Sequence, residues 1–347
     1  MNPKKTPFVS VIMPVRNEAD FIAQALAMAL GQDYPQDRIE VIVADGLSTD
    51  RTQQIIQSLI GQHPNLKLIN NPQKIVPTGL NAALALAQGE IIIRMDAHCE
   101  YPKDYVKKLV LLLQETNAAN VGGVLITTGS ANYAQKSISA AYHSPLSVGA
   151  SLRSYQGEQD FIRDVDDVHG GCWRKSTLVS VGLFDEEMVR NQDDELSFRI
   201  RKNGGRIIQH SGIQVKYHVR DSFSRLFKQF MQYGYWKVWV IGKHPKQASL
   251  RHFAPTSLLS CLISLALLSP FYAYVRFCFG ILSMSYLGII SLSAWTEAAR
   301  SNWKLGPGIS LSLITMHFGY GLGFLIGIFH WLLNMTPNTP TFKELTR

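Results

Sequence analysis

The chain of 347 residues is long enough for one large domain with an appendage, and an apolar fraction of 46% supports a sizeable core. Its four cysteines show neither Cys-x-x-Cys nor zinc-site spacing, which excludes a cysteine-based metal or disulfide framework and indicates a reduced, cytosol-facing catalytic region. The net charge is +8, and much of the basic excess lies at 220–251, just before an apolar C-terminal region; this placement favours an anionic membrane surface over nucleic acid, with a solvated basic face as the alternative.

The first half of the chain alternates short apolar strands with helices. Residues 9–14 have the continuous apolar character of a buried strand, and residues 91–95 repeat it with a run of isoleucines. The other expected elements are strands at 39–44, 66–70 and 121–127 and helices at 21–30, 52–60, 78–88 and 103–116. This alternation predicts an α/β domain with a mainly parallel sheet and helices on both faces.

Two of these strands run directly into acidic turns. Residues 39–44 lead into Asp45 and the following Gly-Leu-Ser-Thr-Asp50, and residues 91–95 lead into Asp96-Ala97-His98. Ligands of open α/β sheets bind at the carboxyl ends of the strands. Asp45 can accept a hydrogen bond from a base or ribose, and Asp96 with His98 can hold Mg²⁺ or Mn²⁺. Taken alone, Asp96 and His98 are equally well explained as a helix cap and a surface histidine.

The middle of the chain carries a further acidic group. Residues 130–170 show no clear period, so a mobile loop is one interpretation of them. A helix is expected to begin at Asp193-Asp194-Glu195. Carboxylates held close together raise one another's pKa, which suits a general base for an acceptor hydroxyl. The alternative is a solvated helix N-terminus, where the helix dipole favours acidic residues.

The last third of the chain has the pattern of a membrane-bound region. Residues 222–240 combine aromatic and basic residues as an interfacial helix does, although a helix packed on a soluble core would also explain them. Apolar segments at 256–275, 277–295 and 310–334 are each long enough to cross a membrane, and Arg276 suggests a tight hairpin between the first two. The basic residues around these segments predict a cytosolic large domain and an external C-terminal tail.

These patterns divide the chain into four parts. We expect a catalytic domain at 1–218, an amphipathic interfacial segment at 219–252, a membrane region of about three transmembrane helices at 253–335, and a tail at 336–347. The protein is then an integral protein of the cell (inner) membrane.

Taken together, the motifs resemble those of the family-2 glycosyltransferases, which have the Rossmann-like GT-A fold. The resemblance covers about residues 8–240, and the whole chain looks most like the succinoglycan-type exopolysaccharide transferases. The matching segments are the opening strand 11–18, the nucleotide-binding turn 45–50, the helix start 79–83, the metal motif 95–98, the base-containing motif 192–196 and the end of the catalytic domain at 229–234.

The resemblance implies a role for each matching residue. Asp193 is expected to be the catalytic base, and Asp96 and His98 the metal ligands. The nucleotide is expected to be bound by Pro14, Asn17, Glu18, Asp45, Asp50, Asn81 and Asp96. The acceptor and its lipid phosphate are expected to be bound by His169, Gly171, Trp173, Arg220, Arg225 and Gln229, with Trp173 either stacking on a sugar or lying in the core.

Three positions depart from the family pattern. His98 stands where the second metal aspartate is expected, which leaves the metal and its ligation open. Gln192 replaces the glutamate before the base and removes one charge. The Q-x-x-R-W motif of processive synthases is not intact, because Gln229 and Gln232 are followed by Tyr233. This last departure argues against a polymer-extruding synthase.

The resemblance therefore implies a membrane-bound, inverting hexosyltransferase of exopolysaccharide or cell-surface glycan synthesis. The expected donor is a nucleotide-diphosphate sugar, UDP-sugar favoured, and the acceptor a polyprenyl-linked saccharide; a divalent cation and membrane lipids take part and nucleic acid does not. A polyprenyl-phosphate sugar synthase would not need the base, and a non-catalytic membrane scaffold would not need three acidic turns. A nicotinamide oxidoreductase is disfavoured because residues 14–18 replace its glycine-rich turn.

Overall fold

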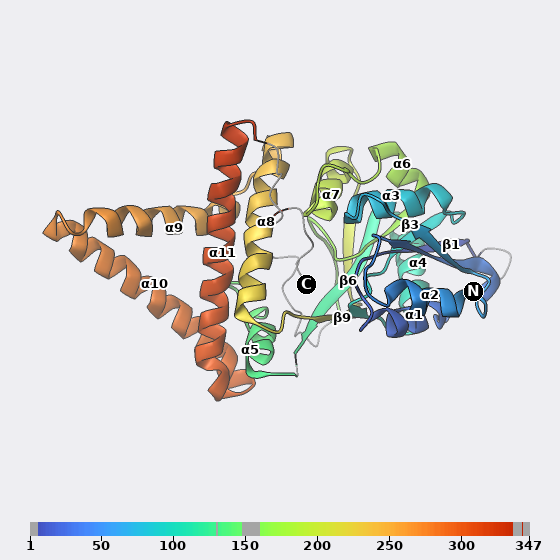
Figure 1. Cartoon of the computed structure of the whole chain (residues 1–347), viewed down its shortest axis with the longest axis horizontal. Helices are drawn as coiled ribbons and strands as arrows, with labels where there is room; N and C mark the ends of the chain where they lie inside the picture. The colour runs from blue at the N-terminus through green and yellow to red at the C-terminus, as the bar shows by residue number, and fades with distance from the viewer. Residues whose placement is uncertain (1–5, 130, 148–159, 336–341, 343–347) are drawn as a thin grey trace. The chain divides into compact units, whose positions relative to one another are not determined.

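The computed structural model describes residues 6–129, 131–147, 160–335 and 342. The chain forms two compact units (Figure 1). The first, here called the sheet unit, comprises residues 1–126 and 155–218, and the second, the helical unit, comprises residues 127–154 and 219–347. The helical unit therefore includes residues 127–154, which lie in the sequence between the two parts of the sheet unit. Of the predicted tail at 336–347, only Phe342 falls within the described residues.

In the described residues, the sheet has nine strands in the order β3-β2-β1-β4-β8-β6-β9-β5, with β7 paired to β9. They are β1 Val9–Val15, β2 Ile39–Asp45, β3 Leu66–Asn70, β4 Ile91–Arg94, β5 Cys99–Glu100, β6 Asn120–Thr128, β7 Ile162–Asp164, β8 Cys172–Arg174 and β9 Ile207–His218. The strands β3, β2, β1 and β4 pair in parallel, as predicted. The β4–β8, β6–β8, β5–β9 and β7–β9 pairings are antiparallel, so the sheet is mixed, with an antiparallel part beside the predicted parallel strands.

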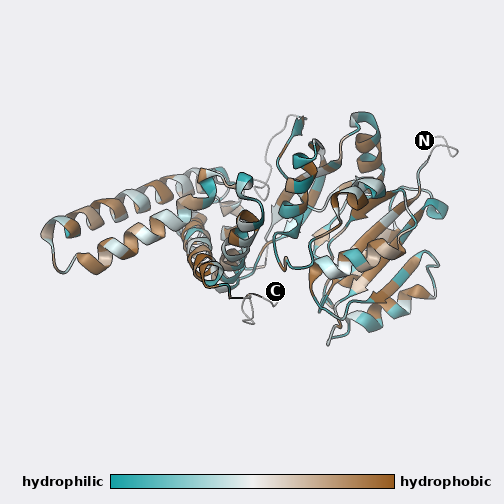
Figure 2. Cartoon of the chain, turned by 90° about the horizontal axis from the view of Figure 1, so that it is seen from above, coloured by the Kyte–Doolittle hydropathy of each residue, from teal (hydrophilic) through white to brown (hydrophobic). Residues whose placement is uncertain are grey.

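Helices cover the sheet and bury its apolar strands. They are α1 Ile22–Leu30, α2 Thr52–Ile60, α3 Val76–Leu86, α4 Tyr105–Thr116, α6 Lys175–Val181 and α7 Gln192–Lys202. One core contains Ile12, Ile42 and Ile92 from neighbouring strands, packed with residues of α3, α6 and α7. The strands are accordingly the apolar part of this unit (Figure 2). Every residue of β4 is buried, which explains its run of three isoleucines, Ile91–Ile93.

Among its described residues, the helical unit contains three helices that are long and apolar enough to cross a membrane, by length and composition. Its helices are α5 Tyr133–Ala141, α8 Phe223–Lys243, α9 Leu250–Leu268, α10 Ala273–Arg300 and α11 Gly306–Leu332. The break between α9 and α10 lies at residues 269–272, before the predicted position at Arg276. Pro270 explains the difference, because it follows the C-cap residue Ser269 and, with no backbone N–H, cannot continue the helix.

Two features of the fold go beyond the sequence predictions. The segment 130–170 is not a loop throughout: it contains α5 and β7, while residues 130 and 148–159 lie outside the described part. Helix α8 packs closely along α11, an arrangement that neither interpretation of residues 222–240 included. A Cβ atom on Gly323 of α11 would lie 1.9 Å from the backbone oxygen of Met231 in α8.

Candidate active site

The turns that follow β1, β2 and β4 lie at one edge of the sheet, because these strands are neighbours and run in parallel. Asn17 and Glu18 follow β1, Asp45 is the last residue of β2, and Asp96 follows β4 by two residues. The sheet order therefore brings together acidic groups that are up to 78 positions apart in the sequence. This edge is where open α/β sheets bind ligands.

The turn after β2 is closed around the buried carboxylate of Asp45. The Ser48 backbone N–H donates to Asp45 Oδ2 at 2.9 Å, and the Ser48 hydroxyl and the Gln53 amide also donate to this carboxylate. Asn17 attaches the preceding turn, since its N–H donates to Ser48 Oγ at 2.8 Å and its Oδ1 accepts from Thr49 N at 2.8 Å. Three of the roughly four acceptor sites of Asp45 are thus occupied within the protein. Asp45 was predicted to accept a hydrogen bond from a nucleotide, and in the structure its carboxylate holds the conformation of its own turn.

Asp50 joins the turns after β1 and β2. Its carboxylate accepts hydrogen bonds from the backbone N–H groups of Ala19, at 3.1 Å, and Thr52, at 2.9 Å, and from the Thr52 hydroxyl at 2.5 Å. Burial acts to raise the pKa of Asp50, but these hydrogen bonds outweigh it and lower the pKa. Asp50 is therefore an ionised anchor for the start of α2.

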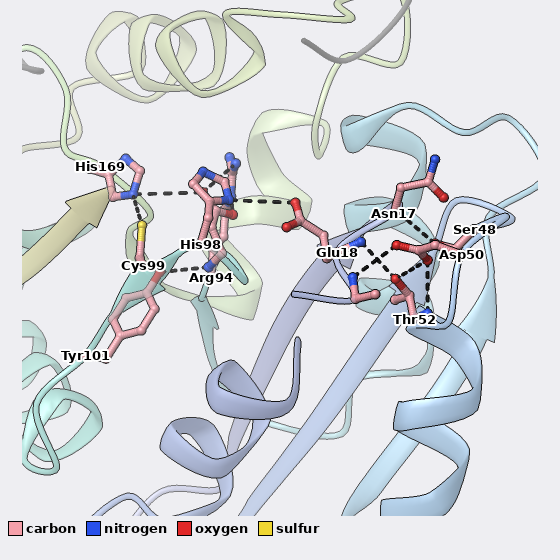
Figure 3. Close-up of polar contacts among 12 residues, drawn as sticks. Asn17, Glu18, Ser48, Asp50, Thr52, Arg94, His98, Cys99, Tyr101 and His169 are labelled. Atoms are coloured by element: carbon pink, nitrogen blue, oxygen red, sulfur yellow. Dashed lines mark hydrogen bonds and ion pairs between the residues drawn. The ribbon is translucent and has the colours of Figure 1, made fainter. Parts of the chain in front are cut away.

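Glu18 connects this turn to the residues that follow β4. Its N–H donates to Thr52 Oγ1 at 2.8 Å, while its side chain points the other way, and Glu18 Oε1 lies 3.9 Å from His98 Nδ1. Figure 3 shows Glu18 between the group around Asp50 and the group around Arg94 and His98. The predicted nucleotide turn and the predicted metal motif are therefore adjacent.

Asp96 forms a buried ion pair that the sequence analysis missed. Arg94 Nε donates to Asp96 Oδ1 at 2.9 Å and Arg94 Nη2 to Oδ2 at 3.1 Å, a bidentate arrangement. Burial acts to raise the pKa of Asp96, but Arg94, followed by His169 and His98, holds it well below its usual range. The backbone N–H of Asp96 donates to the hydroxyl of Tyr101 at 2.7 Å. The sequence signal for this ion pair was Arg94, a single charged residue within the otherwise apolar run 91–95.

His169 lies against Asp96 from the segment before β8. His169 Nε2 is 3.9 Å from Asp96 Oδ2 and 3.5 Å from the sulfur of Cys99. Gly170 and Gly171 adopt positive φ angles of 72° and 109°, and the Gly171 carbonyl accepts from Arg94 N at 3.1 Å. This left-handed turn, which favours glycine, places His169 beside β4. Burial lowers the pKa of His169, against the opposing effect of Asp96.

The acidic start of α7 completes the group. The charge of Asp193 acts on both Arg94 and His169, so Asp193 lies near the Asp96 ion pair. Asp167, which was not among the predicted residues, accepts a hydrogen bond at Oδ1 from the hydroxyl of Ser197 at 2.7 Å. Burial, followed by the charges of Asp193 and Asp194, raises the pKa of Asp167 well above its usual value. Its sequence signal was an acidic residue two positions before His169.

Other predicted residues have structural partners within the sheet unit. The Asn81 amide exchanges two hydrogen bonds with the backbone of Phe184, its Nδ2 donating to the carbonyl at 2.8 Å and its Oδ1 accepting from the N–H at 3.0 Å. Trp173 is 2% exposed and packs edge-on against Phe184, at 6.0 Å between ring centroids. Its ring has no face open to a sugar, so of the two roles predicted for Trp173 the structure shows the core role. Pro14 is partly buried near the end of β1.

The remaining predicted acceptor residues belong to the helical unit. Arg225 Nη1 forms an ion pair with Asp221 Oδ2 at 2.8 Å. Gln229 is 2% exposed, and its Nε2 donates to the hydroxyl of Tyr233 at 3.1 Å. Arg220 lies just before α8 and is partly buried.

The described residues contain no group of three or more His, Cys, Asp or Glu side chains placed to hold a metal ion. Beside the turns after β1 and β4, carboxylates and histidines come together in two pairs, Glu18 with His98 and Asp96 with His169, each with a closest separation of 3.9 Å. Mg²⁺ commonly takes one or two carboxylates and obtains its other ligands from phosphates and water, and an imidazole suits Mn²⁺. The residues therefore fit a cation held mainly by a diphosphate, and not a cage made by the protein alone.

Comparison with known sequences identifies the family. The model of glycosyl transferase family 2 matches residues 10–180. A dolichyl N-acetyl-alpha-D-glucosaminyl phosphate 3-beta-D-2,3-diacetamido-2,3-dideoxy-beta-D-glucuronosyltransferase from Methanococcus voltae is 31% identical over 243 residues, which cover 68% of this chain and 74% of that protein. The chain belongs to glycosyl transferase family 2. The succinoglycan biosynthesis protein ExoA from Rhizobium meliloti is 28% identical over 316 residues, covering 90% of this chain and 93% of that protein.

Solved structures confirm the GT-A fold. The mannosyltransferase PcManGT from Pyrobaculum calidifontis, in complex with GDP-Man and Mn²⁺, matches with a TM-score of 0.60 at 19% identity, over 92% of this chain and 88% of that one. TarS from S. aureus, in complex with UDP-GlcNAc, matches with a TM-score of 0.52 at 15% identity, over 94% and 92% of the two chains. The protein is a glycosyltransferase with three helices that could span a membrane.

Proposed function

We propose that this glycosyltransferase transfers a hexose from a nucleotide-diphosphate sugar, with UDP-sugar favoured, to a polyprenyl-linked saccharide in exopolysaccharide or cell-surface glycan synthesis. The observation that carries the proposal is the convergence of three groups at one sheet edge. They are the linked turns after β1 and β2, which contain Asn17 and Asp50, the Arg94–Asp96 ion pair, and Asp193 at the start of α7. The relatives support the acceptor class, because one is named for succinoglycan biosynthesis and the other for a dolichyl-linked acceptor.

The proposed reaction is a single displacement with inversion. Asp193 accepts the proton of the acceptor hydroxyl as that oxygen bonds to the anomeric carbon, and the bond from this carbon to the diphosphate breaks. Arg94 Nη1 is buried and has no hydrogen-bond partner within the described residues, so a phosphate oxygen of the donor would satisfy it. Arg94 thereby places a fixed positive charge near the leaving group.

Asp96 and His98 are the proposed protein ligands of a divalent cation, which supplies neutralisation of the departing diphosphate when it is bound. Asp45 and Asp50 hold the turn that contacts the base, and Glu18 contacts the ribose. Arg220 and Arg225 are proposed to bind the lipid phosphate of the acceptor. The sheet unit faces the cytosol at the inner membrane, because the basic residues of the chain gather around the apolar helices.

Calorimetric titration of the detergent-purified protein with UDP and GDP, each with and without Mn²⁺, tests the donor. We expect UDP to bind more tightly with Mn²⁺, and Asp96→Ala to remove the dependence on metal. Asp37→Asn is the matched control, because Asp37 has an 82% exposed side chain remote from the turns after β1, β2 and β4. A preference for GDP would reassign the donor, and failure of the folded protein to bind either nucleotide would contradict the proposal.

A transfer assay with Asp193→Asn tests the base. We expect a loss of 10²-fold or more, roughly the contribution of general base catalysis, with nucleotide binding retained. Unchanged transfer would favour a polyprenyl-phosphate sugar synthase, in which an ionised lipid phosphate is the nucleophile and needs no base.

A further inference from the structure

The three long apolar helices differ in how much of each is covered within the protein. Of the most apolar part of each helix, 17% is buried in α9 and 11% in α10, but 56% in α11. Figure 1 shows α8 lying alongside α11, whereas α9 and α10 leave α11 and meet at a tip away from it. About half of α11 is therefore covered by protein, whereas α9 and α10 are largely open to their environment.

Helix α8 runs in the same direction as α11 and at a constant offset. Cβ atoms on Gly319, Gly323 and Gly327 of α11 would lie 2.8, 1.9 and 2.9 Å from the backbone oxygens of Phe227, Met231 and Tyr235 of α8, respectively. Each step of four residues along α11 thus corresponds to four residues along α8. If α11 crossed a bilayer, α8 would have to lie in the bilayer beside it.

The sequence of α8 is unsuited to that environment. It contains Arg225, Lys228, Lys237 and Lys243 and no acidic residue. Phe227 lies opposite Gly319, midway along α11, so Arg225 and the exposed Lys228 would be close to the bilayer centre. Charged side chains are costly there and normally face the interior of a helix bundle. The same residues suit a helix that lies in the membrane interface, with basic groups at the level of lipid phosphates.

The first half of α11 is held by a segment that connects two strands of the sheet. The hydroxyl of Tyr133 in α5 donates to the Lys304 carbonyl at 3.1 Å and accepts from Gly308 N at 3.1 Å. Further along α11, His317 Nε2 donates to the carbonyl of Leu146 at 2.8 Å. In the sequence this segment lies between β6 and β7, and α8 follows β9, so both elements that contact α11 here are joined by the chain to strands of the sheet.

The α9–α10 hairpin has the features of a spanning pair. At 1.5 Å per residue, the 19 residues of α9 extend about 28 Å, close to the hydrocarbon thickness of a bilayer. Its tip carries Phe271, Tyr272 and Tyr274, which are 76%, 51% and 69% exposed, with Arg276 nearby. Exposed aromatic residues beside a cation are typical of a membrane–water interface. At the other end of the hairpin, Trp303 is 65% exposed.

We propose that only the α9–α10 hairpin crosses the membrane, while α11 lies with α8 in the interface on the side of the sheet unit. The occupant of the exposed hairpin faces is lipid. The end of α11 then lies on the same side as the catalytic residues, in contrast to the three-span arrangement that hydropathy alone predicts. The inference does not depend on the donor, the acceptor or the role of any site residue.

Labelling with a membrane-impermeant maleimide on sealed vesicles of both orientations tests this arrangement in the full chain. Cys261 and Cys278, which are exposed, are first replaced by serine, whereas Cys99 and Cys172 are buried. Single variants Asp37→Cys, Ser269→Cys and Met335→Cys then report the sheet unit, the hairpin tip and the end of α11. We expect Asp37→Cys and Met335→Cys to react from one face and Ser269→Cys from the other. The proposal would be overturned if Met335→Cys were labelled from the same face as Ser269→Cys. It would also be overturned if Ser269→Cys were labelled from the same face as Asp37→Cys.

Depth measurement with spin labels gives an independent test that does not use the turns. Labels are placed on α11 at Leu311, Leu322 and Phe329, and on α10 at Phe277, Met284 and Leu292, all at least 36% exposed. We expect equal depth at the three α11 positions and a progressive change along α10. A label at Leu322 deeper than those at Leu311 and Phe329 would show that α11 spans and would refute the proposal. Unchanged thermal unfolding relative to the cysteine-depleted parent shows that each variant folds.

Discussion

The contact between α8 and α11 makes a quantitative prediction for Gly323→Ala. The added methyl carbon would lie 1.9 Å from the backbone oxygen of Met231 and 2.7 Å from its carbonyl carbon, whereas ordinary contact begins at 3.4 Å. Neither helix backbone can rotate away from the other, so α8 must shift relative to α11 by more than an ångström. Overpacking of this kind costs about 1–3 kcal/mol, and a clash with backbone belongs at the upper end.

The intrinsic effect of the substitution has the opposite sign. Alanine in a helix interior is more favourable than glycine by about 1 kcal/mol. The net expectation for Gly323→Ala is a destabilisation of about 2 kcal/mol after this gain is subtracted from the packing cost. Gly288→Ala in α10 is the matched control, because a Cβ atom at Gly288 would have nothing within 4 Å. The control retains only the favourable term and should be more stable by up to about 1 kcal/mol.

Thermal unfolding in detergent, followed by tryptophan fluorescence, measures both variants. A loss of about 2 kcal/mol corresponds to a decrease in Tm of roughly 4–8 °C for a domain of 150–250 residues. Equal Tm values for Gly323→Ala and Gly288→Ala would refute the close backbone contact between α8 and α11. That result would also remove the main support for placing α11 in the interface.

Three further predictions concern the sheet unit. Glu40→Gln should lower the free energy of unfolding by about 1.5–3 kcal/mol, because the buried Glu40 carboxylate accepts hydrogen bonds from Lys67 Nζ at 2.8 Å and from two other donors. Burial acts to raise the pKa of Glu40, but Lys67 and the other donors lower it. The stabilisation is therefore present above the unfolded pKa and lost as pH falls through the folded pKa. Denaturant titrations over a pH series would contradict this if the difference in unfolding free energy between wild type and Glu40→Gln stayed constant down to strong acid. Arg94→Lys should destabilise the fold and weaken diphosphate binding, since lysine cannot pair with Asp96 in a bidentate manner, and wild-type affinity in calorimetry would argue against the role of Arg94. Asn17→Ala should raise the Kd for nucleotide more than it lowers Tm, because Asn17 links two exposed turns, and an unchanged Kd would dissociate these turns from binding.

Local patterns determined much of the sheet unit. Near-continuous apolar runs predict β1, β2 and β4, because strands buried on both faces lack the regular alternation of apolar and polar residues. The acidic turns after β2 and β4 were visible for the same reason, as charges that end such a run. The short strands β5, β7 and β8 have two or three residues each and no period, so the antiparallel half of the sheet could not be predicted.

The sequence by itself determined which residues are chemically suited to a glycosyltransferase site, and that the C-terminal helices are apolar. Only the tertiary structure decided how those residues are used. Asp96 is paired with Arg94 and lies beside His169, 73 positions away, because strand order and a glycine turn place them together, and Trp173 is in the core because Phe184 covers it. Likewise, the sequence shows a stripe of glycines on α11, because Gly319, Gly323 and Gly327 are spaced four residues apart. Mean hydropathy is an average over the helix and carries no information about the neighbouring helix. The neighbour proved to be a basic helix, and contact with it, more than composition, sets where α11 can lie.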